Sequence, residues 1–191
     1  LCTGSLPLKA KWLKGYDKEN VFTVPKDKIY LDQMHEKLNN VNKIIVIGAG
    51  FIGVEISDEL KKADKEVILI EKLPRILGLA FDEDISCKVE HLMKERGVKV
   101  ITSASVTEIT GNGKVEGVML DNGEIIDAGA VILSMGYKPN SAIAEKAGLA
   151  VSKKGFIKVD DYMRTENPDV FAVGDCAEKR DFITRKPAGI M

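Results

Sequence analysis

An apolar run that leads directly into a glycine-rich turn constrains the fold of this chain more than any other feature. Ile44 to Ile47 form the continuous apolar stretch that a strand buried on both faces of a parallel sheet requires. Gly48-Ala-Gly50-Phe-Ile-Gly53 follows at once, and a helix-compatible stretch begins behind it. This order of strand, glycine turn and helix is the dinucleotide-binding fingerprint, and it predicts a Rossmann-like α/β domain.

Each glycine of the fingerprint has a separate task. Gly48 permits the tight turn, Gly50 lets the backbone approach a pyrophosphate, and Gly53 lets the helix pack close to the strand. The N–H groups and the dipole of the helix N-terminus favour the phosphates. We therefore predict that Gly48, Gly50 and Gly53, with Phe51 and Ile52 between them, bind NAD(H).

A second buried strand, Glu66-Val-Ile-Leu-Ile-Glu71, ends in an acid. Glu71 lies 18 residues after Gly53, close to the spacing of about 20 for the carboxylate that accepts ribose hydroxyls. Because that carboxylate repels a 2′-phosphate, we expect NADH to be preferred over NADPH. Lys72, also assigned to the NAD site, and Arg75 would offset part of the repulsion. The alternative is a doubly wound domain that binds nothing, in which Glu71 is only a solvated strand end.

The composition argues against several function classes. The formal net charge of −1 creates no field that favours nucleic acid or an anionic membrane, and no apolar stretch approaches the roughly 20 residues of a membrane span. The cysteines, Cys2, Cys87 and Cys176, form no CxxC pair and no metal-ligand spacing. They are expected to be small, buried, reduced thiols in a cytoplasmic protein without a bound metal ion. Because the chain begins at Leu1 rather than Met, we expect a fragment of a longer protein.

Along the chain, alternating strands and helices give way to an antiparallel meander. Helices are predicted over 32–38, 52–63, 82–96 and 141–147, and strands over 43–47, 66–71, 98–102 and 130–134. Short strands over 105–110, 115–120 and 124–127 are joined by the hairpin signals GNGK and DNG. Residues 1–30 are predicted to be irregular apart from the end of a buried strand at 1–5. Two further strands are expected over 156–160 and 170–173.

Four segments carry motifs in a fixed order: Cys2-Thr3-Gly4-Ser5, Gly48 to Glu55, Leu133 to Asn140, and Thr165 to Asp175. Together they resemble the flavin-dependent pyridine nucleotide–disulfide oxidoreductase family over essentially the whole chain. The first and fourth resemble the family's two flavin motifs, the second its NAD fingerprint, and the third the G-x-[KR]-P-N segment that closes its NAD domain. Each motif alone is weak, but four in the family's order, with a meander between the second and third, are highly specific.

One branch of the family fits best. Pro74 to Ile85 and the stretch CAEKRDFITRKPAGIM after Asp175 resemble the NADH oxidase, NADH peroxidase and coenzyme A-disulfide reductase branch. Some of its members carry an aromatic residue near the nicotinamide at the position held here by Ala80, with Phe81 beside it. Thioredoxin reductase-like members keep a CxxC ahead of the NAD fingerprint, whereas residues 1–47 contain only Cys2.

The resemblance implies a Rossmann-like three-layer NAD-binding domain, with a parallel sheet and an antiparallel β-meander, flanked by pieces of an FAD-binding domain. Residues 1–25 would be the end of the first FAD segment, 26–140 the NAD(H)-binding domain, and 141–191 the start of the returning FAD segment. Glu55 and Gly136 are implied to position the nicotinamide half of NAD(H). The alternative for Glu55 is an ordinary polar residue on the helix. The implied FAD-binding residues are Thr3, Gly4, Gly174 and Asp175.

The function implied by the resemblance is the NADH-binding portion of a flavoprotein oxidoreductase. Hydride would pass from NADH to FAD, and electrons onward to a disulfide, oxygen or peroxide acceptor. The redox cysteine would lie upstream of residue 1, the full-length protein would be a homodimer, and the fragment alone would be inactive, with no catalytic residue of its own. A second hypothesis stays open, namely a sensor or regulatory module that binds a dinucleotide without turnover. The flavin motifs at both ends favour the enzyme.

Overall fold

The computed structural model describes residues 1–184 and 186–188. The chain divides into two compact units. The first, the sheet unit, is Leu8–Gly136, and the second, the terminal unit, joins Leu1–Pro7 to Tyr137–Met191. The end of the predicted 141–191 segment, residues 185 and 189–191, lies outside the described residues. Because the division at 7/8 and 136/137 does not assign either unit to a cofactor, the predicted FAD and NAD segments stay a prediction.

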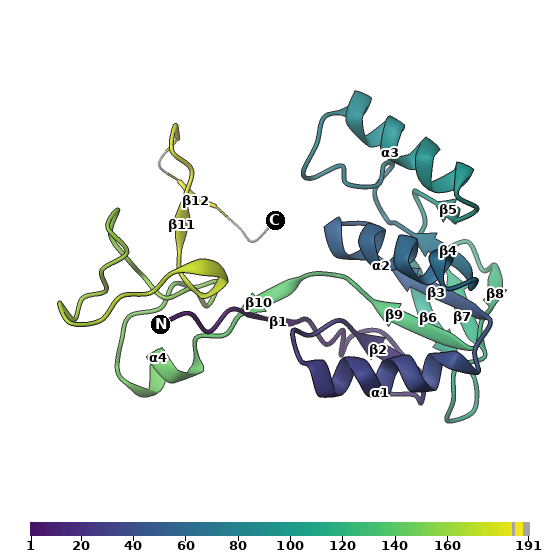
Figure 1. The fold of residues 1–191 in the computed structure, drawn as a ribbon, viewed down its shortest axis with the longest axis horizontal. Coiled ribbons are helices and arrows are strands. Elements are labelled where there is room, and N and C mark those ends of the chain that lie inside the picture. The colour runs from purple at the N-terminus through teal and green to yellow at the C-terminus, as the bar shows by residue number, and fades with distance from the viewer. Residues whose placement is uncertain (185, 189–191) are drawn as a thin grey trace. The chain divides into compact units, whose positions relative to one another are not determined.

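A five-stranded parallel sheet forms the centre of the sheet unit (Figure 1). Its order is β2-β9-β3-β4-β5, comprising Val21–Thr23, Ala130–Leu133, Lys43–Ile47, Glu66–Ile70 and Lys99–Ile101. In the register, Ile44 lies opposite Val67 on one side and Ala130 on the other. All five strands run the same way, so the turns that follow β9, β3 and β4 meet at one edge of the sheet.

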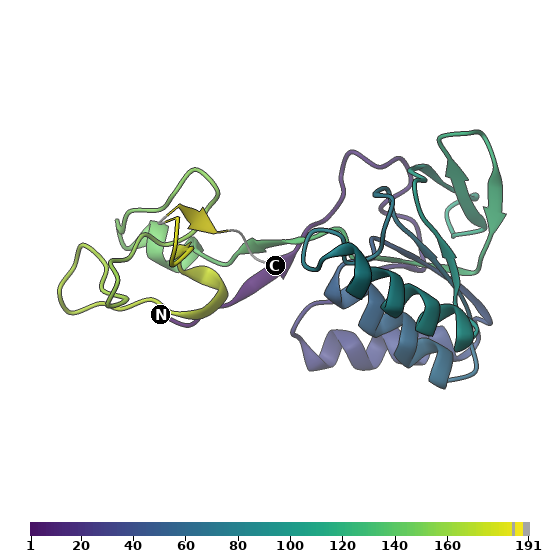
Figure 2. The same cartoon turned by 90° about the horizontal axis from the view of Figure 1, so that it is seen from above.

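Side chains of β3 alternate between two cores, one on each face of the sheet. Ile44 and Val46 pack with α1 (Lys28–Asn39), α2 (Phe51–Lys62) and α3 (Glu83–Glu95). Ile45 and Ile47 pack against the antiparallel sheet of β6 (Val106–Thr110), β7 (Gly117–Leu120) and β8 (Ile125–Asp127). Figure 2 shows the helices on one side of the parallel sheet and this meander on the other. The predicted three-layer α/β fold, with a parallel sheet and an antiparallel meander, is confirmed.

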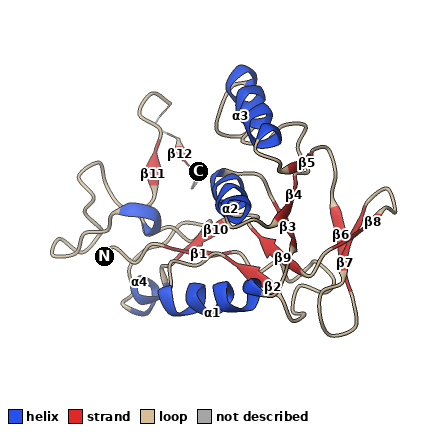
Figure 3. Ribbon diagram, turned by 45° about the vertical axis from the view of Figure 1, so that its right-hand side comes forward, coloured by secondary structure: helices blue, strands red, loops and turns tan. Residues whose placement is uncertain are grey.

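The terminal unit consists mostly of loops. Among its described residues, the strands form two short antiparallel pairs, β1 (Ser5–Pro7) with β10 (Tyr137–Pro139) and β11 (Lys179–Arg180) with β12 (Pro187–Ala188). The helices are α4 (Ala142–Lys146) and the single 3₁₀ turn η1 (Gly174–Cys176), both visible in Figure 3. The buried apolar side chains form a small cluster of Ala144, Ile157, Val159, Ala172, Cys176 and Ala177.

Several predicted elements differ from the structure. The segments 156–160 and 170–173 are not strands, because their pairing is limited to isolated bridges such as Ile157 with Ala177 and Arg164 with Phe171. The expected strand end at 1–5 is also wrong: Gly4 has a φ of +67°, and the strand begins only at Ser5. Conversely, the stretch predicted to be irregular contains β2, which is held in place by parallel pairing with β9 more than 100 residues later in the sequence.

Candidate functional site: the glycine loop and its surroundings

Two glycines of the loop are required by the protein's own packing. Gly48 has a φ of +98°, and a Cβ there would lie 2.7 Å from the carbonyl oxygen of Ser134. A Cβ on Gly53 would lie 1.8 Å from the carbonyl oxygen of Gly48. Side chains at these positions would collide with backbone, so both glycines serve the tight turn and the close approach of α2 to β3.

Gly50 is different, because nothing in the protein requires a glycine there. Its φ of −73° suits any residue, and a Cβ on it would meet no atom within 4 Å. Gly50 is also the N-cap of α2 and provides no side-chain cap for the helix. Since the first N–H groups of a helix lack partners within the helix, a smooth open surface at this end suits an approaching anion. The loop therefore fits the pyrophosphate of a dinucleotide.

Protein groups already hold the first half of the loop. The N–H of Gly48 donates to the Ile70 carbonyl at 2.8 Å, and the carbonyl of Ala49 accepts the N–H of Leu77 at 2.8 Å. The carbonyl of Gly48 accepts the hydroxyl of Ser134 at 2.6 Å. The loop is thus fixed up to Ala49, whereas Gly50 faces open space.

Glu71 stands where β4 ends and contacts the loop directly. Its Oε2 accepts the N–H of Ala49 at 2.7 Å, and its Oε1 accepts the N–H of Leu73 at 2.8 Å. Each carboxylate oxygen has two lone pairs, so both can accept a further bond from a ribose hydroxyl. Glu71 is half-buried rather than a solvated strand end. The structure therefore gives it a second task, which sequence analysis missed: it anchors the glycine loop to β4.

Lys72 and Arg75, the two cationic residues close to Glu71 in sequence, have different surroundings. Lys72 is exposed, and Arg75 pairs with Glu83 at the start of α3. The ion pair with Glu83 engages the guanidinium of Arg75, which was expected from the sequence to offset part of the charge of Glu71. Arg75 is thereby less suited to a 2′-phosphate, which is consistent with the expected preference for NADH.

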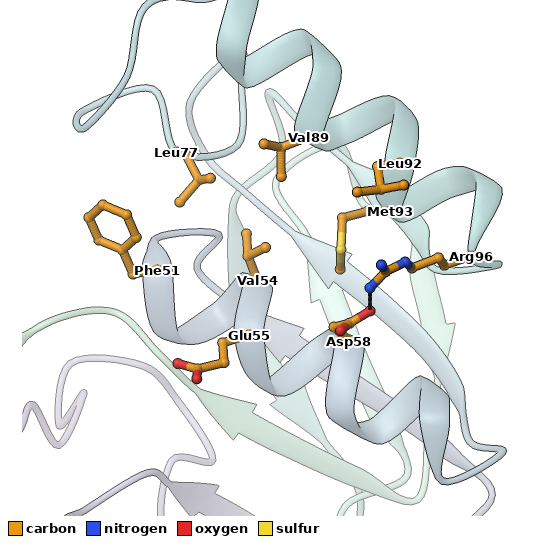
Figure 4. Close-up of a pocket in the computed structure, with 9 residues that line it drawn as sticks. All are labelled: Phe51, Val54, Glu55, Asp58, Leu77, Val89, Leu92, Met93 and Arg96. Atoms are coloured by element: carbon orange, nitrogen blue, oxygen red, sulfur yellow. Dashed lines mark hydrogen bonds and ion pairs between the residues drawn. The ribbon is translucent and has the colours of Figure 1, made fainter.

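The helix that follows the loop borders an open groove of about 340 Å³ between α2 and α3 (Figure 4). Phe51 lies at one end, 43% exposed, and meets Phe81 edge to face with ring centroids 5.5 Å apart. Glu55 also borders the groove, but Figure 4 shows its carboxylate directed away from α3. Ile52 is half-buried. The structure thus places Phe51 beside the aromatic residue that sequence analysis noted next to Ala80.

An ion pair closes the other end of this groove. Asp58 of α2 bonds to Arg96, which follows α3, and also to Lys62 at 2.8 Å. Hydrogen bonds from Lys62 and then from Arg96 hold the pKa of Asp58 below its ordinary value. The carboxylate therefore stays charged under ordinary conditions and links the two helices.

Gly136 follows β9 at the same edge of the sheet as the glycine loop. It has a φ of +113°, is exposed, and its carbonyl accepts the N–H of Leu8 at 2.9 Å. The positive φ explains the glycine, since L-residues rarely adopt it. Parallel pairing of β9 with β3 thus brings Gly136 to the edge that carries Gly48 and Glu71.

The predicted flavin residues gather within the terminal unit. Thr3 donates its hydroxyl to the Asn140 carbonyl at 2.5 Å, and Asn140 returns a bond from its side chain to the Thr3 carbonyl at 3.2 Å. Asp175 accepts the hydroxyl of Ser5 at 3.1 Å and lies 3.5 Å from Lys179. Gly4 and Gly174 have φ values of +67° and +80°, and a Cβ on either would meet no atom within 4 Å. These open, polar surroundings fit contacts to part of an FAD molecule, with Thr3 and Asp175 as its partners.

Sequence reasoning missed three polar residues that hold these sites: Ser134, Asn140 and Ser5. All three lie within the motif segments, but their partners are distant in sequence: 86 residues for Ser134 with Gly48, 137 for Asn140 with Thr3, and 170 for Ser5 with Asp175. No local pattern could have indicated these contacts, because they depend on which strand ends become neighbours.

The cysteines differ from expectation. Cys176 is buried, as predicted, but Cys2 and Cys87 are exposed. Cys87 lies on the polar side of α3, whose buried residues are Ser86 and Met93, and Cys2 precedes the turn at Gly4. Cys176 ends the 3₁₀ turn, and Ala177 after it is extended.

Within 1–184 and 186–188, no group of three or more His, Cys, Asp or Glu side chains is arranged to hold a metal ion. None of the helices that the structure describes combines the length and the apolar character needed to cross a membrane.

The chain is similar to known proteins over almost its whole length. The family described as pyridine nucleotide-disulphide oxidoreductase matches residues 1–189. An NADH oxidase of Methanocaldococcus jannaschii is 36% identical over 187 residues, which are 96% of this chain and 41% of that protein. The solved NAD-dependent persulfide reductase of A. fulgidus has a TM-score of 0.90 and 36% identity, over 99% of this chain and 35% of that one. The NADH-bound, water-forming NADH oxidase of Lactobacillus brevis has a TM-score of 0.86 and 29% identity, over 99% and 41%.

The chain spans only 35–41% of the length of these relatives. The predicted family and its NADH oxidase-like branch are nevertheless confirmed, because the relatives include NADH oxidases and a CoA-dependent sulfur oxidoreductase. Since the family match runs from the motif at Cys2 through the fingerprint and beyond Asp175, this chain belongs to the pyridine nucleotide-disulphide oxidoreductase family.

Proposed function

We propose that this chain supplies the NADH-binding site and part of the FAD site of a flavoprotein oxidoreductase. In the full-length protein, hydride passes from NADH to FAD, and electrons continue to a disulfide, oxygen or peroxide acceptor. Relatives whose names specify NADH oxidation or persulfide reduction support this class of reaction. The full-length protein is proposed to be a homodimer.

The chain's own residues bind and orient rather than react. Gly50 and the N-terminal turn of α2 receive the pyrophosphate, while Glu71 accepts hydroxyls of the adenosine ribose and Gly136 gives the nicotinamide half close backbone contact. In the terminal unit, Thr3 and Asp175 bind FAD, with Gly4 and Gly174 leaving room for it. Bound NADH and FAD supply the redox chemistry itself.

Gly50 is the observation that carries this proposal. Gly48 and Gly53 are explained by backbone that would collide with a Cβ, whereas Gly50 has an ordinary φ and open space. A glycine that the fold does not need, at the N-terminus of a helix, is consistent with a ligand that must approach the backbone.

Titration of NADH into wild type and Gly50→Ala tests the proposal. We expect saturable binding by wild type and at least tenfold weaker binding by the variant, because the added methyl group occupies the space that the pyrophosphate needs. The urea midpoint serves as the control, since alanine at this φ costs little stability. Equal affinities at equal stability would contradict the assignment of the loop.

The alternative is a sensor module that binds a dinucleotide without turnover. The Thr3–Asn140 and Ser5–Asp175 contacts favour the enzyme, because a sensor needs no flavin site. The full-length protein separates the two: an enzyme is yellow as purified and bleaches on addition of NADH. A colourless protein that binds NADH would support the sensor instead.

A further inference from the structure

Ser134 directly follows β9, beside the glycine loop, and the proposed ligand contacts do not involve it. Its N–H donates to the Ile47 carbonyl at 2.9 Å, which continues the pairing of β9 with β3. Its Oγ lies 2.6 Å from the Gly48 carbonyl oxygen and 3.0 Å from that of Ile47. A hydroxyl has one proton, and the Ile47 carbonyl already accepts the N–H, so the shorter contact to Gly48 takes the proton.

The carbonyl that receives this bond is confined by α2. A Cβ on Gly53 would lie 1.8 Å from the Gly48 carbonyl oxygen and 2.7 Å from the Ser134 Oγ. The Gly48 carbonyl therefore points at the first turn of the helix, and the serine hydroxyl meets it there. Removing the hydroxyl would leave this enclosed carbonyl without that donor.

The same peptide group is held at its other end. The Gly48 carbonyl and the Ala49 N–H belong to one planar unit. Ser134 donates to the carbonyl from β9, and Glu71 accepts the N–H at 2.7 Å from β4. Because β9 and β4 flank β3 on opposite sides (Figure 3), groups at the ends of these two strands fix the Gly48–Ala49 plane, which lies just ahead of the peptide that joins Ala49 to Gly50.

We propose that Ser134 is a positioning residue that sets the Gly48–Ala49 peptide plane and thereby presents Gly50 and the α2 N-terminus to the dinucleotide pyrophosphate. This role rests on the proposed binding of NADH by the glycine loop. Ser134 acts through the loop backbone and has no contact with the reacting atoms.

Two alanine variants of this chain test the proposal, each of which removes one hydroxyl. Ser134→Ala removes the donor to Gly48, and Ser57→Ala removes a buried hydroxyl that bonds at 2.6 Å to the Gly53 carbonyl. That carbonyl lies within α2, so the helix ladder still satisfies it in the control variant. We expect Ser134→Ala to weaken NADH binding about tenfold and Ser57→Ala to leave it within about twofold. Ser134→Thr, which keeps a hydroxyl, is expected to recover most of the affinity.

Amide hydrogen exchange without nucleotide provides a readout that a general loss of stability would not produce. The amides of residues 49–53 should exchange faster in Ser134→Ala and be unchanged in Ser57→Ala. Wild-type affinity in Ser134→Ala, or equal losses in both alanine variants, would overturn the positioning role. Faster exchange with unchanged affinity would overturn it as well, whereas failure of wild type to bind NADH would overturn the proposed function itself.

Discussion

In the sheet unit, five paired strands lie between three helices and a second sheet, and every side chain of β3 from Ile44 to Ile47 is buried. In the terminal unit, the described strands are two or three residues long, and three of the six core side chains are alanines. The sheet unit thus has the apolar area to hold its site without ligand, whereas the terminal unit orders its polar residues through a few hydrogen bonds such as the two between Thr3 and Asn140.

This difference shows how the two candidate sites depend on their surroundings. The glycine loop is held by groups from β4 and β9, both of which belong to the sheet unit. The flavin-side residues Thr3 and Asp175 are held by Asn140 and Ser5, with little packed core near them. Binding at the loop should therefore survive in this chain, and binding at the flavin-side residues should need more of the protein.

The largest expected effect is the complete absence of one cofactor. We expect this chain, expressed as it stands, to bind NADH but to retain no stoichiometric FAD. Thr3 and Asp175 offer too few contacts to offset association costs of roughly 4–15 kcal/mol. The visible absorption spectrum of the purified chain measures this directly, with NADH titration as the control. A stoichiometric flavin spectrum would contradict the expected difference between the two units in cofactor binding.

Gly53→Ala should have the next largest effect, which is a loss of stability. Its Cβ would meet the Gly48 carbonyl oxygen at 1.8 Å, so the loop or α2 must move. We expect the free energy of unfolding of the sheet unit to fall by about 2–3 kcal/mol, against less than about 1 kcal/mol for Gly50→Ala. Urea unfolding followed by circular dichroism measures both. Equal stabilities of the two variants would mean that the loop is less tightly packed than the structure indicates.

Glu71→Gln should change both affinity and cofactor preference. The carboxylate accepts two N–H groups, and an amide replaces one of these acceptors with a donor. We expect wild type to prefer NADH, and the variant to bind NADH roughly tenfold more weakly with a smaller preference over NADPH. Titrating both nucleotides into both proteins tests this. Equal or tighter binding of NADPH by wild type would contradict the role of Glu71 at the ribose.

Cys176→Ser should have the smallest effect, although Cys176 directly follows Asp175, one of the predicted flavin residues. The thiol is fully buried, with its sulfur 3.3 Å from the Val173 carbonyl, which a serine hydroxyl can also reach. In the full-length protein, NADH-dependent turnover should stay within a few-fold of wild type at unchanged flavin content. A loss of about a hundredfold in turnover, or about 2.7 kcal/mol, would place the redox centre in the terminal unit.

The accuracy of sequence prediction differs between the two units, because the main elements of the sheet unit are marked by strong local signals. β3, α2 and the hairpins were predictable, because a continuous apolar run, a glycine turn and DNG-type turns are local signals. The strands expected over 156–160 and 170–173 were wrong. Their apolar residues Ile157, Val159 and Ala172 point into a small core, and pairing is limited to isolated bridges. Exposure of Cys2 and Cys87 was likewise unpredictable from residue type alone.

By itself the sequence determined the central strands and helices of the sheet unit, the family and the residues of the glycine loop, because each is marked by motifs of a few neighbouring positions. The tertiary structure alone decided that Val21–Thr23 joins the sheet beside β9 and that Glu71 and Ser134 hold the two ends of the same peptide plane. Such contacts exist only when strand ends far apart in the sequence become neighbours. That arrangement depends on burying both faces of one sheet rather than on any local pattern.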